Sequence, residues 1–255
     1  MLQNRIIPGL LLDGNSLVKT INFKKSKYIG DPINTIRIFN ELEVDELVLL
    51  DITATRLKKS PNFKLITELT NECFMPLAYG GGIRHIDDAK KLFNIGIEKV
   101  IINSFLFEKP SFITQLAKNF GSQSVVASID IKKNLFGNYQ ILSNAGGKKQ
   151  KVNIMNWVKE LENLGAGELL ITAIHKEGTW SGFDFDLVEK ISNSVNIPVI
   201  AHGGASSLSD IEQVIKKSNA SAACLGSMVV YQRKGMGVLI NFPEQSDVYD
   251  RLHKH

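Results

Sequence analysis

Cysteine is scarce in this 255-residue chain, and Cys73 and Cys224 are its only two. Their spacing fits neither a zinc site nor a disulfide framework, which indicates a reducing compartment and predicts a cytoplasmic protein. No run of about 18 apolar residues occurs, and the N-terminus lacks the pattern of a signal peptide, so we expect no membrane segment. A strong excess of charge of one sign is missing too. The formal net charge of +4 suits an anionic metabolite and argues against a nucleic acid partner.

The chain does contain a regular alternation of short apolar runs and longer amphipathic segments. Its composition, 44% hydrophobic and 22% charged, is that of a globular protein with a sizeable core. Most short runs are apolar on both faces, which is typical of parallel strands covered by helices. The predicted strands are 5–12, 46–52, 75–80, 99–103, 124–130, 168–174, 197–203 and 221–226.

Helical patterns lie between these strands at 31–44, 85–96, 153–167 and 207–219. Two insertions interrupt the rhythm. We expect residues 13–30 to form a long basic loop and residues 134–152 to form a small hairpin after the fifth strand.

Eight strands alternating with helices predict an α/β fold, the (β/α)8 or TIM barrel, over a single domain of residues 1–255. The main alternative is an open doubly wound sheet. A repeat at an offset of about 120 residues separates the two, because "AYGGGIR" (78–84) matches "AHGGASS" (201–207) and "INSFLF" (102–107) matches "LGSMVV" (225–230). We therefore expect a closed barrel with a two-fold repeat of half-barrels, about 1–120 and 121–240.

The repeat also predicts ligand chemistry. Each half has a glycine-rich turn directly after a strand, followed one strand later by a serine, Ser104 or Ser227. Glycines let the backbone approach an oxyanion closely, and the N–H groups of a following turn can bind it. The glycines could serve only to permit tight turns. Two copies in register favour a ligand with a phosphate at each end.

These segments, together with "RIIP", "DELVLLDITA", "FGSQSVVASID" and "GAGELLIT", resemble the HisF family, the cyclase subunit of imidazole glycerol phosphate synthase. The resemblance extends from residue 5 to about residue 230. It implies that ammonia from a HisH-type glutaminase, docked at the bottom of the barrel, passes along the axis. At the top it would react with a bisphosphorylated ribulosyl aminoimidazole carboxamide intermediate, a phosphorylated small molecule. The resemblance implies no metal and no organic cofactor.

Site residues follow from the resemblance position by position. The first phosphate site would comprise Gly82, Asn103 and Ser104, and the second Gly178, Gly204 and Ser227, with Lys19 as a loop lysine over the substrate. An ammonia gate would comprise Arg5, Glu46, Lys99 and Glu168. Independently of the family, these four stand at strand starts, and two cations with two anions can neutralise one another in a partly buried ring. Some of them could instead be ordinary solvated charges.

The acid–base pair departs from the family pattern. Asp130 ends its strand as a catalytic carboxylate would. The partner position on the first strand is Leu11, and Asp13, two residues on, is a poor substitute. The remaining candidate contacts to substrate on this rim are Asp51, His175, Glu177, Thr179 and His202.

An intact scaffold without the first acid resembles a second-copy branch of HisF, which works with a glutaminase and an amidotransferase-like protein. That branch is implicated in forming acetamidino groups on surface-polysaccharide sugars. The alternatives are a genuine cyclase of histidine biosynthesis, a non-catalytic ammonia conduit and, less well matched, an isomerase of the related half-barrel sugar family.

Overall fold

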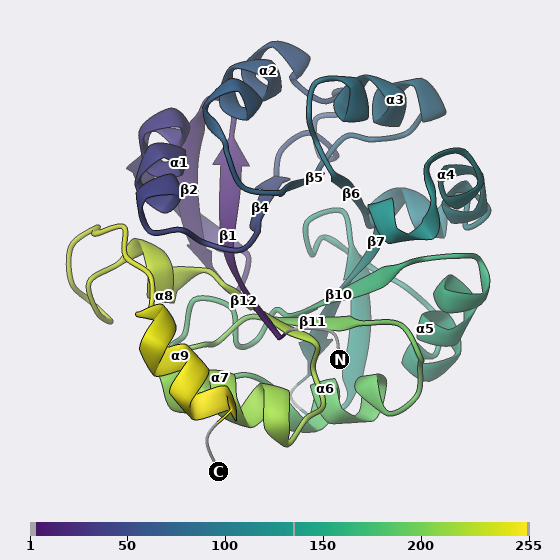
Figure 1. Ribbon diagram of the computed structural model, residues 1–255. Helices are drawn as coiled ribbons and strands as arrows, with labels where there is room; N and C mark the ends of the chain where they lie inside the picture. Colours follow the sequence, from purple (N-terminus) through teal and green to yellow (C-terminus); the bar gives the residue numbers. More distant parts are fainter. Residues whose placement is uncertain (1–3, 135, 254–255) are drawn as a thin grey trace.

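The computed structural model describes residues 4–134 and 136–253, so the extreme ends of the predicted domain lie outside the described residues. Within them, eight parallel strands close into a barrel surrounded by helices (Figure 1). The strands are β1 (Arg5–Asp13), β4 (Leu47–Asp51), β5 (Leu77–Gly80), β6 (Lys99–Ile102), β7 (Val125–Lys133), β10 (Glu168–Ala173), β11 (Val199–His202) and β12 (Ala222–Leu225). Parallel pairing of β1 with β12 and of β6 with β7 joins the two halves. The predicted (β/α)8 barrel is confirmed.

The outer helices begin where the sequence provides caps. The Asp31 side chain accepts a hydrogen bond from Asn34 N, and Pro32 follows in the first turn, which fixes the start of α1 (Pro32–Glu41). Asn62, Asn153 and Asp184 cap α2, α5 and α6 in the same way. The remaining bounds are α2 (Phe63–Glu72), α3 (Ile86–Asn94), α4 (Phe112–Phe120), α5 (Ile154–Asn163), α6 (Phe185–Ser192), α7 (Leu208–Lys216), α8 (Ser227–Val230) and α9 (Gln245–His253), with 3-10 turns η1 (Ser104–Phe107) and η2 (Ser122–Ser124).

Two hairpins extend the first strand of each half. The expectation of a loop at 13–30 is wrong, because β2 (Ser16–Ile21) pairs antiparallel with β1 and then with β3 (Lys24–Gly30). The predicted hairpin after the fifth strand is confirmed: β8 (Tyr139–Ser143) pairs antiparallel with β7 and with β9 (Lys148–Lys149), and residue 135 of this insertion lies outside the described residues. Both hairpins start from the carboxyl end of a barrel strand.

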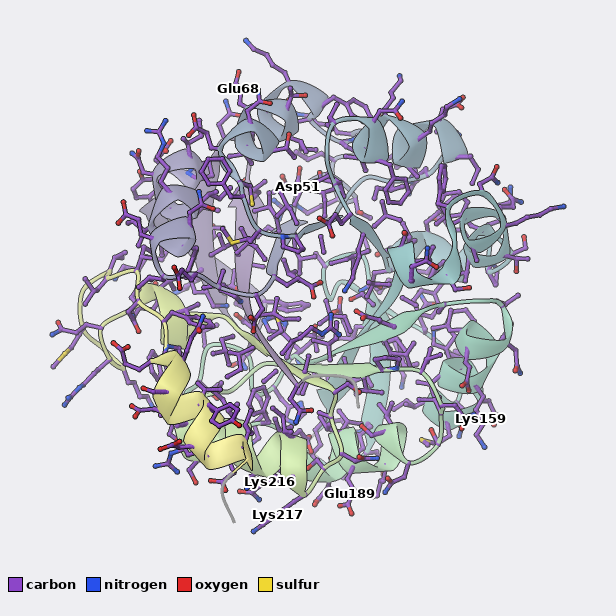
Figure 2. All side chains as sticks on the ribbon, in the orientation of Figure 1. Asp51, Glu68, Lys159, Glu189, Lys216 and Lys217 are labelled. Carbon is purple, nitrogen blue, oxygen red and sulfur yellow. The ribbon has the colours of Figure 1, made fainter. Side chains whose placement is uncertain are left out.

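The core has two parts because barrel strands bury both faces. Ile6, Leu10 and Leu12 face the helices, whereas Ile7 faces the barrel interior. The interior cluster comprises Ile7, Val48, Ala78, Ile101, Val126, Leu170, Ile200, Ala222 and Cys224. Charged side chains such as Glu68, Lys159 and Glu189 project outward from the helices, while Asp51 lies toward the barrel centre (Figure 2). No described helix is both long and apolar enough to cross a bilayer.

Candidate active site at the barrel mouth

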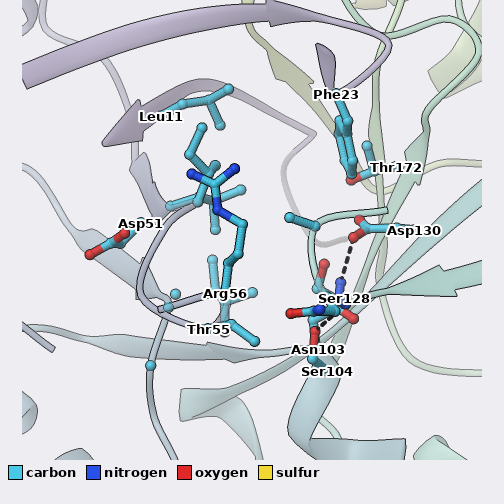
Figure 3. A pocket seen from close by; sticks show the side chains of 18 of the residues that line it. Leu11, Phe23, Asp51, Thr55, Arg56, Asn103, Ser104, Ser128, Asp130 and Thr172 are labelled. Atoms are coloured by element: carbon cyan, nitrogen blue, oxygen red, sulfur yellow. Dashed lines mark hydrogen bonds between the residues drawn. The ribbon is translucent and has the colours of Figure 1, made fainter. Parts of the chain in front are cut away.

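A cavity of about 410 Å³ opens at the carboxyl ends of the barrel strands (Figure 3). Both halves line it: Leu11, Asp51 and Asn103 come from the first, and Asp130 and Thr172 from the second. Carboxyl ends of barrel strands are where such folds place reactive side chains. Of the residues predicted at strand ends, Leu11, Asp51, Asn103 and Asp130 are thus brought to one cavity.

Asp130 is the buried carboxyl of this cavity, only 7% exposed. Burial raises its pKa to about 7, although hydrogen bonds from Asn103 and Thr172 oppose the shift. The Asn103 amide Nδ2 donates to Asp130 Oδ2 at 2.9 Å. A carboxyl with a pKa near neutrality can both take up and release a proton at physiological pH.

Strand register places Leu11 at the position equivalent to Asp130. Asp130 pairs with Thr172 of β10, and Leu11 pairs with Leu50 of β4, the matching strand of the first half. Ile7 and Val126 both face the barrel interior, so Leu11 and Asp130, four residues further along, also face inward. Figure 3 shows them on opposite walls of the cavity. Asp13 also lines this cavity but lies at the end of β1, paired with Ser16.

The residues predicted for the first phosphate site, Gly82, Asn103 and Ser104, line the cavity, and we call this set the first phosphate cradle. Gly82 has φ +73, and a Cβ there would lie 2.5 Å from the Lys59 carbonyl oxygen, so the turn requires glycine. Asn103 Oδ1 is buried with no hydrogen-bond partner. Ser104 Oγ accepts from the backbone N of Asn144 at 2.8 Å, which ties this cradle to the β8–β9 hairpin.

The residues predicted for the second phosphate site, Gly178, Gly204 and Ser227, form what we call the second phosphate cradle, and the two cradles share one backbone angle. Asn103 and Gly226, which precede the two serines, share a ψ of −91°. This cradle lies beside a separate cavity of only about 10 Å³. Lys19 and Glu177 form an ion pair next to it, with side chains 4% and 1% exposed. Lys19 therefore lies on strand β2 against the second cradle, and its placement in a flexible loop is wrong.

The two histidines differ in their surroundings. His202 lines both cavities, and its Nδ1 lies 3.2 Å from Thr172 Oγ1. Burial, with a contribution from Lys19, lowers the pKa of His202 to about 3, so the ring is neutral at physiological pH. His175 lines neither cavity; its Nε2 lies 2.8 Å from Asp184 Oδ2, and its Nδ1 accepts from Lys133 N.

Asp51 and Thr179 stabilise loops. Asp51 Oδ1 accepts from the backbone N of Thr53 and of Ala54, each at 2.9 Å. Thr179 Oγ1 donates to the Lys176 carbonyl at 2.7 Å and lines neither cavity. Asp51 lines the large cavity and keeps its second carboxylate oxygen available.

The predicted gate residues form a closed ring of ion pairs, the gate ring, at the opposite ends of the strands. Arg5 donates to Glu46 at 2.5 Å and to Glu168 at 2.8 Å. Lys99 bridges the same two carboxylates at 2.9 and 3.3 Å. Although burial opposes it, the two carboxylates hold the pKa of Arg5 above its usual value. Each cation thus contacts both anions, as a neutral ring requires.

Two contributors escaped the sequence reasoning. Thr172 ends strand β10, and the rule that found Asp130 could have found it too. Arg56 lines the cavity from the loop after β4, and no motif marks it. Across residues 4–134 and 136–253, no three His, Cys, Asp or Glu side chains are grouped so as to hold a metal ion.

The closed eight-stranded barrel with two matching glycine turns at its mouth defines a (β/α)8-barrel protein of the half-barrel-repeat class. The chain belongs to the family described as "Histidine biosynthesis protein", whose model matches residues 5–235. It is 47% identical to a Pseudomonas aeruginosa protein whose name gives it provisionally as imidazole glycerol phosphate synthase subunit hisF2, over 96% of this chain and 97% of that protein.

Two further relatives cover similar lengths. A Vibrio vulnificus protein, named provisionally as subunit hisF3, is 44% identical over 97% of this chain and 95% of that protein. The imidazole glycerol phosphate synthase subunit HisF of Lactococcus lactis is 41% identical over 91% and 90%. The resemblance to HisF is confirmed.

Proposed function

We propose that this chain is a HisF-type enzyme subunit that incorporates ammonia into a phosphorylated substrate at the barrel mouth. The observation that carries the proposal is the combination of a near-neutral buried carboxyl, Asp130, with phosphate cradles in both halves. Its relatives carry the names of imidazole glycerol phosphate synthase subunits, which supports this chemistry.

Ammonia would enter through the gate ring. A HisH-type glutaminase docked at the amino ends of the strands would release ammonia there, and the apolar barrel interior would favour the neutral molecule over ammonium. At the mouth, the ammonia nitrogen would add to an electrophilic carbon, and the π bond of that carbon to its oxygen or nitrogen would break, leaving the electron pair on that atom. Ionised Asp130 would take up the proton that the ammonia nitrogen loses. Asn103 would keep the carboxylate oriented.

Leu11 favours amidine formation on a surface-polysaccharide sugar over imidazole ring closure. Ring closure in the family uses two aspartates. Leu11 occupies the position of one of them in the strand register. Leucine cannot transfer a proton. The provisional second-copy names of two relatives agree with this branch. Under this proposal an amidotransferase-like protein would act with the chain and its glutaminase.

Cyclase turnover separates the two branches. We expect the wild-type chain, given ammonium salt and the bisphosphorylated intermediate, to produce almost no imidazole glycerol phosphate. Leu11→Asp should raise that turnover measurably. The control Leu11→Asn, whose side chain has the shape of aspartate, should not raise it, because only the aspartate can exchange a proton. Robust wild-type turnover would exclude the sugar branch and leave the histidine-biosynthesis cyclase.

A non-catalytic ammonia conduit is the second candidate, and the loss at Leu11 beside a retained gate ring favours it. Asp130→Asn distinguishes it from an enzyme. In the complete assembly a catalytic Asp130 predicts a loss of product of about 10²-fold or more. An unchanged yield would identify the barrel as a conduit.

A further inference from the structure

Arg56 is a solvent-exposed cation that lines the cavity. It lies in the loop between β4 and α2 and lines the same cavity as Asp130 and Leu11. In Figure 3 its guanidinium extends inward toward Leu11, across the cavity from Asp130. Among the described residues it has no hydrogen-bond or ion-pair partner, and Leu11, toward which it points in this view, cannot neutralise a charge.

Four other charged side chains of the cavity are engaged, whereas those of Asp13, Lys24 and Lys25 line it without a hydrogen bond or ion pair among the described residues. Glu177 is paired with Lys19, Asp51 caps the turn that follows β4, and Asp130 accepts from Asn103. Arg84, a second arginine of the cavity wall, lies 3.4 Å from Glu108 and over the ring of Phe105. In the described part of the chain, no ion pair joins Arg56 to these acids or to Asp13.

The loop that carries Arg56 is held in shape. Leu57 N donates to the Thr53 carbonyl and Lys59 N to the Ala54 carbonyl, both at 2.9 Å. Asp51 fixes the start of the same loop. A fixed backbone limits where the Arg56 side chain can reach, which lowers the entropy cost of binding.

We propose that Arg56 forms a third anion-binding site at the barrel mouth, beside Leu11 and separate from the two phosphate cradles. Its planar fork suits a carboxylate or a phosphate oxygen pair of the bound ligand. The inference deepens the proposed function, because it assigns the substrate an anionic group close to the position of the missing acid. The inference also connects Arg56 with the leucine at position 11, because a carboxylate at that position would pair with Arg56 and occupy this site.

Anion titration by calorimetry on the full chain tests the site without any catalytic assay. Pyrophosphate and malonate are the phosphate and carboxylate probes. We expect Arg56→Ala to weaken binding of at least one probe about tenfold or more. Arg84→Ala, the matched control on the same wall, should weaken it less than twofold, because Arg84 is already paired. The probe that loses affinity identifies the oxyanion that Arg56 prefers.

Two further variants test where the site lies. Leu11→Asp should weaken the same probe as Arg56→Ala does, and Leu11→Asn should not. The Arg56→Ala loss should persist in a Ser104→Ala background, because the site is separate from the first phosphate cradle. Wild-type affinity in Arg56→Ala, or a loss that disappears without Ser104, would overturn the proposal. Neither result depends on whether the chain turns over a substrate.

Discussion

At the scale of a single residue, the burial of Asp130 affects both its proton transfer and the stability of the fold. Its pKa near 7 means that the folded state favours the protonated form over a range in which an unfolded aspartate is already ionised. The same burial that prepares this carboxyl for proton transfer therefore opposes folding once the pH rises.

Asp130→Asn should be more stable than the wild type above pH 7. Between about pH 4 and pH 7 the folded wild type retains a proton that the unfolded chain releases, so its stability falls as pH rises, by up to about 1.4 kcal/mol per pH unit. An asparagine carries no such penalty. Urea unfolding at pH 4.5 and pH 8 measures the two differences. A difference independent of pH would contradict the assigned pKa shift.

Individual residues were predictable where a positional rule applied. Asp130 and Leu11 follow from the rule that barrel strands end at the mouth, and the structure places both on the cavity wall. The direction of a side chain beyond the strand was not predictable. His175 was a candidate substrate contact, yet it turns to Asp184, the cap of α6, because Tyr139 and Lys133 of the β7–β8 hairpin enclose it there.

At the scale of elements, the β2–β3 hairpin depends on one buried ion pair. Glu177 contacts Lys19, accepts from Phe23 N at 3.2 Å through its side chain, and accepts from Asn22 N at 2.9 Å through its carbonyl. These contacts hold the tip of the hairpin over the mouth of the barrel. The sequence suggested a loop here because its basic residues interrupt the apolar alternation by which strands are recognised.

Glu177→Gln should loosen this hairpin, because it leaves the Lys19 ammonium buried without a charge partner. Removing one member of a buried pair costs about 3–5 kcal/mol. We expect lower stability in urea and faster amide hydrogen exchange over residues 19–26. The double variant Lys19→Met/Glu177→Gln should recover part of the loss. Equal losses in the single and double variants would show that the charge pair is not the cause.

At the scale of the whole molecule, the fold was predictable because its signal is repeated. Strands apolar on both faces and a two-fold sequence repeat leave few architectures available. The residues of the gate ring were named from the resemblance to HisF, and their positions at strand starts independently favoured a ring, since strand starts meet at one end of a barrel. What escaped prediction depends on contacts between distant loops, such as the bond from Asn144 to Ser104.

Arg5→Ala should uncouple glutamine hydrolysis in the glutaminase from ammonia use in this chain. It leaves Lys99 alone to neutralise two carboxylates, so the ring would open and ammonia would be lost before it enters the barrel. In the complex with the glutaminase, we expect several-fold less product from glutamine but unchanged product from added ammonium. Arg37→Ala, which breaks an exposed pair with Glu72, is the control and should change neither. Parallel losses from both nitrogen sources would contradict a gating role.

The two hairpins approach the mouth from opposite walls, and they meet. A Cβ on Gly146 would lie 3.2 Å from Phe23 Cδ2, so the tip of one hairpin packs on the turn of the other. Both hairpins line the cavity, so a ligand that leaves between them must first separate this contact. Product release, and not bond formation, would then be rate-limiting. The steady-state rate would therefore fall as solvent viscosity rises.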